Sequence, residues 1–112
     1  MYKNIASMLQ VVEGEIQDES KIKEREIDTI VNAANPTLMG SKNGVDCAIH
    51  TAVDKGLKKS GGFKKKICRE LKTGNNRNLI RCERGRAVVT GGYKLCRRII
   101  HVVGISCDGE RK

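Results

Sequence analysis

Two pairs of polar residues stand close together in the segment 30–50, IVNAANPTLMGSKNGVDCAIH. Asn32 and Asn35 follow an apolar run, and Asp46 and His50 are four residues apart. Residues four apart lie on one face of a helix, so a helix here would bring a carboxylate and an imidazole together. Asp46 and His50 each also have a purely structural explanation. An acidic residue in a first turn stabilises a helix, and a histidine can be partly buried without taking part in chemistry.

A glycine-rich turn joins the two pairs. The string Gly40-Ser41-Lys42-Asn43-Gly44 excludes a regular element and leads directly into the expected helix. The amino end of a helix offers free backbone N–H groups and the positive end of the dipole, which both favour phosphate. The small residues Ala33 and Ala34 would let a ligand approach the backbone closely. An ordinary strand–loop–helix connection remains the alternative interpretation.

The elements that position this turn follow from hydrophobic periodicity. Residues 27–31 are expected to form a buried strand whose carboxyl end presents the asparagines, and ligands tend to sit at that end in α/β sheets. A helix is expected from about Val45, and a second helix over 63–72. Further strands are predicted at 9–13, 87–90 and 99–103, with Gly91-Gly92 as the turn between the last two, and residues 17–26 as a loop or helical turn. This order predicts an α/β layered fold.

Length and composition favour one modest domain. The chain has 112 residues, 38% of them hydrophobic and 31% charged, and only three are aromatic. Its formal charge of +9 is uneven, because acidic residues outnumber basic ones in residues 1–54 and the reverse holds afterwards. A basic half can attract phosphate-bearing partners, or it can simply be a solvated surface. Nucleic-acid binding is the weakest hypothesis, since stacking aromatics are scarce.

The five cysteines include no C-x-x-C pair, so neither a zinc site nor a disulfide framework is indicated. We expect reduced cysteines in a cytoplasmic protein without metal or cofactor. The first residues lack the apolar run of a signal peptide, and no stretch reaches the length that spans a membrane. No membrane partner is therefore expected.

An ordered series of short motifs resembles the macro-domain family. Val31-Asn32-Ala33-Ala34-Asn35 is followed by Leu38-Met39-Gly40, Gly44-Val45-Asp46 and Ala48-Ile49-His50. Gly14-Glu15-Ile16 lies upstream, and GRAVVT at 85–90, Gly92-Tyr93, Leu95 and IHVVG at 100–104 follow in order. The resemblance covers residues 9–104.

The resemblance implies a mixed sheet flanked by helices that binds ADP-ribose, and for many members hydrolysis of ADP-ribosyl linkages or related esters. It implies that Asp46 activates the attacking water, with Asn35 at the distal ribose and His50 in support. Ile16 would line the adenine end, and Glu15 stands where the family usually has an aspartate for the adenine amino group. The implied ligand-binding residues are Glu15, Ile16, Asn32, Ala33, Ala34, Asn35, Gly40, Gly44, Val45 and Asp46.

The resemblance also implies further helices, two further strands and a second glycine-rich phosphate loop beyond residue 104. We therefore expect residues 1–112 to form one partial macro domain, with a polar tail at 105–112. Its free sheet edge is expected to pair with a second copy or a complementing chain. The function expected is ADP-ribose or ADP-ribosylated-protein binding, with hydrolysis weakened or lost. A non-catalytic ADP-ribose-binding or interaction module is the alternative.

Overall fold

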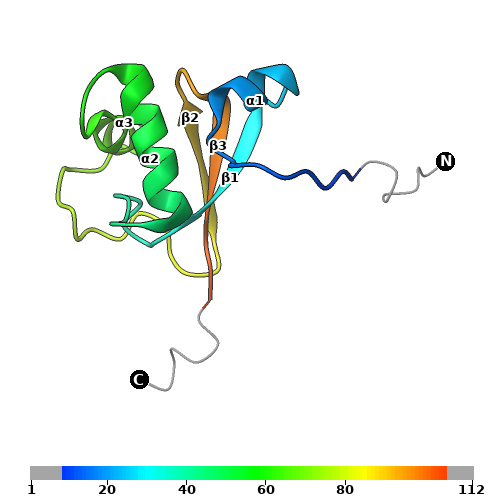
Figure 1. The fold of residues 1–112 in the computed structure, drawn as a ribbon. Helices are drawn as coiled ribbons and strands as arrows, with labels where there is room; N and C mark the ends of the chain where they lie inside the picture. Colours follow the sequence, from blue (N-terminus) through cyan, green and yellow to red (C-terminus); the bar gives the residue numbers. More distant parts are fainter. Residues whose placement is uncertain (1–8, 106–112) are drawn as a thin grey trace.

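The computed structural model describes residues 9–105 (Figure 1). Three helices and three strands follow one another along this part of the chain. In sequence order they are α1 (Glu19–Glu24), β1 (Thr29–Ala34), α2 (Gly44–Leu57), α3 (Gly62–Glu70), β2 (Ala87–Gly92) and β3 (Cys96–Val103). This arrangement confirms the predicted α/β class. Among the described residues, no helix is long and apolar enough to cross a membrane.

The sheet has β3 in the centre, in the order β1-β3-β2. β1 runs parallel to β3, with Asn32 opposite His101 and Ala34 opposite Val103. β2 is antiparallel to β3 and forms a hairpin with it. The carboxyl end of β1 leads into the loop that precedes α2, so the sheet fixes where this loop begins.

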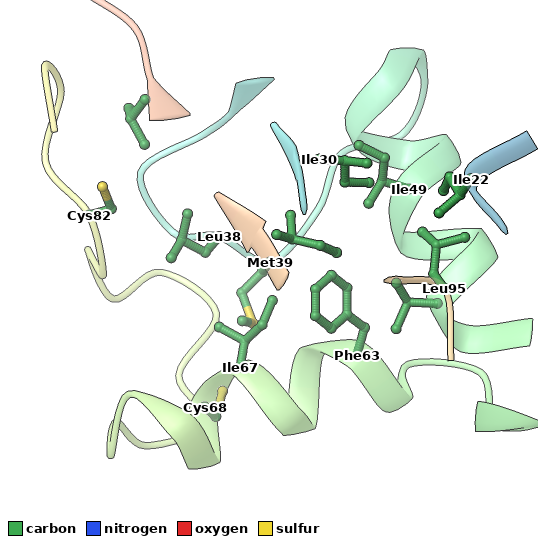
Figure 2. Packing of buried hydrophobic residues seen from close by; sticks show 13 residues of the cluster. Ile22, Ile30, Leu38, Met39, Ile49, Phe63, Ile67, Cys68, Cys82 and Leu95 are labelled. Atoms are coloured by element: carbon green, nitrogen blue, oxygen red, sulfur yellow. The ribbon is translucent and has the colours of Figure 1, made fainter. Parts of the chain in front are cut away.

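Helices α2 and α3 cover one face of the sheet (Figure 1). Within the described chain, Phe63, which is fully buried, is the one aromatic residue of the hydrophobic core cluster, whose other buried side chains are aliphatic or contain sulfur. Leu38 and Met39 of the loop after β1 point into the same core as Phe63 and Ile67 of α3 (Figure 2). Packing of these two side chains in the core therefore holds the loop in place. Burial of each aliphatic or aromatic side chain contributes about 1.5–3 kcal/mol to the stability of the fold.

The opposite face of the sheet remains open within residues 9–105. Val31, Val89 and Val102 alternate with the inward-facing residues of their strands and are 52%, 53% and 37% exposed. The outer edge of β1 has no partner among the described strands. The expectation that a second chain pairs with this edge therefore stays a prediction.

The expected strand at residues 9–13 is wrong. This segment has no regular structure, and Leu9 and Val11 are 71% and 99% exposed. A strand needs a neighbour to pair its backbone groups, and no described strand lies beside this segment. The polar tail lies outside the described residues from 106 onward.

Smaller corrections concern element bounds. Gly91 and Gly92 belong to β2 rather than to the turn, which is formed by residues 93–95 and closed by a bond from Leu95 N to Gly92 O of 3.0 Å. The strand predicted at 27–31 starts at Thr29 and continues to Ala34. Among the described residues, Cys47, Cys68, Cys82 and Cys96 are free cysteines.

Candidate functional site

The loop between β1 and α2 has a backbone that only glycine adopts easily. Gly40 and Gly44 have φ angles of +86° and +83°, in the left-handed region. A Cβ on Gly40 would also lie 3.3 Å from the His50 ring. Leu38 is left-handed too, at +62°, and its buried side chain offsets that strain by packing in the core. The loop is therefore a specific shape rather than a loose connection.

Asn35 holds this shape from within. Its Nδ2 donates to the carbonyl oxygen of Gly40 at 2.8 Å, and its Oδ1 accepts from Leu38 N at 3.1 Å and from Thr37 Oγ1 at 2.8 Å. The side chain is half-buried. In this structure Asn35 shapes the loop, and the ribose contact predicted for it stays a prediction.

The amino end of α2 opens to solvent at this loop. Asn43 precedes the helix and makes no side-chain capping bond, so the first N–H groups of the helix are left without a capping side chain. A Cβ placed on Gly44 would meet no heavy atom within 4 Å, and Val45 is 51% exposed. Uncapped amides beside open space can accept an anion.

Asp46 lies in the first turn of α2, with its side chain directed inward. It is 7% exposed. Its Oδ1 accepts from Nδ2 of Asn32 at 2.8 Å, and its Oδ2 accepts from Oγ of Ser41 at 3.1 Å. The Nε2 atom of His50 lies 3.5 Å from Oδ1. Asp46 and His50 thus come together, as their spacing predicted, and a buried carboxylate with fixed donors is well placed to orient a reacting group.

His50 is held in an apolar setting beside this carboxylate. Burial lowers its pKa, against the opposing effect of the Asp46 charge. Its ring lies 4.7 Å from the Phe63 ring, and within residues 9–105 neither ring nitrogen has a hydrogen-bond partner. The imidazole is therefore neutral near pH 7, and it lines the site as an uncharged group.

The remaining predicted site residues differ in exposure and in the direction of their side chains. Ala33 is exposed and Ala34 half-buried, whereas the Asn32 side chain is fully buried and directed at Asp46 rather than at a ligand. Glu15 is exposed and accepts from Gln17. No group of three or more His, Cys, Asp or Glu side chains in the described ranges is arranged to hold a metal.

The predicted adenine end lies away from the loop. Ile16 and Glu15 line a cavity of about 230 Å³ together with Ile27 and Ile30, at the amino end of β1. The loop that carries Gly44 follows the carboxyl end of β1, whereas the Asp46 carboxylate contacts Asn32, two residues beyond Ile30. The rise of a strand is roughly 3.3 Å per residue, so most of the length of β1 separates the cavity from the loop, though not from Asp46.

Three further residues at the site are not among the predicted site residues. Ser41 donates to Asp46. Arg81 donates through Nη1 to the Thr37 carbonyl at 3.1 Å, and its backbone N–H donates to Pro36, so it anchors the loop from outside. His101 contacts Asn32 beneath the site. Strand alternation would have placed His101 inward beside Ile99 and Val103, whereas nothing in the sequence marks Ser41 or Arg81.

Comparison with known proteins gives a consistent result. The profile of the family described as Macro domain matches residues 31–112. The ADP-ribose glycohydrolase MACROD1 of Bos taurus is 39% identical over 90 residues, which are 80% of this chain and 23% of that protein. The O-acetyl-ADP-ribose deacetylase of Salmonella newport is 37% identical over 101 residues, which are 89% of this chain and 46% of that protein.

A solved structure shares the fold. The Oceanobacillus iheyensis macrodomain with ADP aligns with a TM-score of 0.54 and 37% identity, over 75% of this chain and 40% of that one. This chain therefore spans less than half the length of each of these three relatives.

Proposed function

Because this chain belongs to the macro-domain family, we propose that it binds ADP-ribose through the loop between β1 and α2. The observation that carries this proposal is the uncapped amino end of α2 beside Gly44, where backbone amides face open space. Those amides would hold the diphosphate, and the left-handed glycines allow the backbone to approach it. The structure of a relative with ADP supports the same ligand class.

We further propose that Asp46 orients a water for hydrolysis of an ADP-ribosyl linkage. Oxygen of the water would bond to the anomeric carbon of the distal ribose as the bond to the leaving group breaks, and the water's proton would pass to an acceptor at the site. The carboxylate would also stabilise the positive charge that develops at that carbon. The glycohydrolase and deacetylase activities named for two relatives support a hydrolytic reaction.

A non-catalytic ADP-ribose-binding module is the second proposal. It is favoured by the separation of the cavity beside Ile16 from the loop at Gly44, since a ligand held at only one of these places would be bound without being aligned for attack. Both proposals require binding, and only the first requires turnover.

Calorimetric titration with ADP-ribose tests the shared claim, with ADP as a comparison that lacks the distal ribose. We expect saturable one-to-one binding that is weakened about tenfold by Gly44→Ala, because a left-handed alanine costs roughly 1–2 kcal/mol. Gly74→Ala is the matched control, since Gly74 has no left-handed φ angle and open space around it. No heat of binding for the wild type, or equal weakening by the two substitutions, would contradict the proposal.

A further inference from the structure

A row of polar side chains crosses the core directly beneath Asp46. Asn32 on β1 and His101 on β3 are register partners, and Thr90 on β2 follows them on the same sheet face. Their exposed fractions are 0%, 0% and 2%. Buried polar groups are costly unless each is hydrogen-bonded, so this row requires a reason.

The donor and acceptor roles in the row follow from its Asp46 end. An ionised carboxylate only accepts, so Asn32 must turn its Nδ2 toward Oδ1 of Asp46, which lies 2.8 Å away. The same Nδ2 lies 3.2 Å from Nδ1 of His101. Nδ1 must therefore accept, and the proton of the neutral ring is on Nε2.

The far end of the row can satisfy the same assignment. Oγ1 of Thr90 can donate its one proton to the Gly91 carbonyl, 3.1 Å away, and accept from Nε2 of His101, 2.9 Å away. With the proton on Nε2, each of these groups has a partner.

We infer that His101 is a positioning residue, which fixes the amide orientation of Asn32 and thereby the carboxylate of Asp46. This inference rests on the proposed function for its catalytic meaning. If Nδ1 carried a proton, it would face the Asn32 amino group. The amide could relieve that clash only by turning Oδ1 toward the Asp46 carboxylate, which would repel it. The tautomer of a histidine that does not reach solvent thus controls the group proposed to orient water.

The charged groups around His101 are consistent with a neutral ring. Burial, with a smaller contribution from His50 on α2, lowers its pKa to about 4, against the attraction of Asp46 on α2 and Glu70 on α3. Lys64 on α3 acts on His50 in the same lowering direction. His101 should therefore stay neutral over the range in which an enzyme of this kind would be assayed.

Nitrogen-15 NMR of the imidazole rings tests the inference without depending on activity. The chain has only two histidines, and His50→Gln assigns their signals. We expect His101 in the wild type to show the Nε2–H tautomer at pH 7, and Thr90→Val to raise the Nδ1–H population by removing the acceptor. Thr90→Ser keeps a hydroxyl and should restore the wild-type tautomer.

The kinetic consequence is measured on the same variants. Thr90→Val should lower kcat for ADP-ribose release by about tenfold or more without weakening ADP-ribose binding, because a displaced catalytic group loses rate rather than affinity. A wild-type His101 with its proton on Nδ1 overturns the inference, even if Thr90→Val does not fold. A wild-type kcat in Thr90→Val, despite a changed His101 tautomer, also overturns the inference. If the wild type binds or releases no ADP-ribose, the proposed function fails, and the tautomer is still decided by the spectrum.

Discussion

Asp46→Asn is expected to lower the rate of ADP-ribose release by about 10²- to 10⁴-fold, the range for losing a positioned acid–base group. Binding should change little, because the amide keeps the hydrogen bonds of the carboxylate. Its Oδ1 can still accept from Asn32, and its Nδ2, in place of Oδ2, can donate to Oγ of Ser41. The substitution therefore removes the charge and basicity while leaving the local structure in place.

Release of ADP-ribose from a modified protein, measured beside calorimetric affinity, separates the two effects. Asp28→Asn is the matched control, since Asp28 is an exposed carboxylate at the other end of β1. Asp46→Ala is a poorer test, because it would leave the buried Asn32 amide without an acceptor and destabilise the fold by about 1–3 kcal/mol. Unchanged turnover in Asp46→Asn would exclude Asp46 as the group that orients water. Absence of turnover in the wild type would instead favour the non-catalytic alternative.

The free energy of unfolding is expected to fall by about 3 kcal/mol as the pH decreases from 7 toward 4, owing to His101. In the folded chain its pKa is lowered to about 4, chiefly by burial, whereas the unfolded chain has the ordinary value of 6.5. Between these values the unfolded state binds a proton that the folded state does not. The stabilisation is therefore complete above pH 6.5 and is lost as the pH falls toward 4. His50, whose pKa is also lowered by burial, acts in the same direction.

Urea denaturation at pH 7 and pH 4.5 measures this loss. Carboxylates also begin to titrate near the lower pH, so the comparison is made with His101→Gln, whose amide does not titrate in this range. The variant should be less stable at pH 7 and should lose distinctly less stability on acidification than the wild type. Equal losses in both proteins would show that His101 does not cause the pH dependence.

The parts of the fold predicted correctly are those with strong local signals. The helix at Gly44–Leu57 follows from the periodicity of Ile49 and Val53 and from the glycines that precede it. The helix at Gly62–Glu70 follows from the glycines at its start, which separate it from the preceding helix, and from Phe63 and Ile67 on one face. The macro-domain resemblance, based on ordered motifs, is confirmed by the family profile.

The errors arise where distant residues decide the outcome. The local pattern predicts a strand over residues 27–31 that ends at the polar Asn32. In the structure Asn32 is an interior strand residue whose amino group contacts Asp46 and His101, 14 and 69 positions away in the sequence. The segment at 9–13 has the composition of a strand, but pairing depends on a neighbour that no local pattern supplies. Likewise, the contact of Arg81 with the loop at Thr37 spans 44 positions.

Following the backbone amides of isotopically labelled protein during addition of ADP-ribose tests most directly whether the β1–α2 loop is the binding element. We predict that the largest chemical-shift changes occur at Gly40, Gly44 and Val45, with smaller ones at Asp46. Saturating changes confined to other segments, such as the basic stretch 77–86, or no changes at all, would contradict binding at this loop.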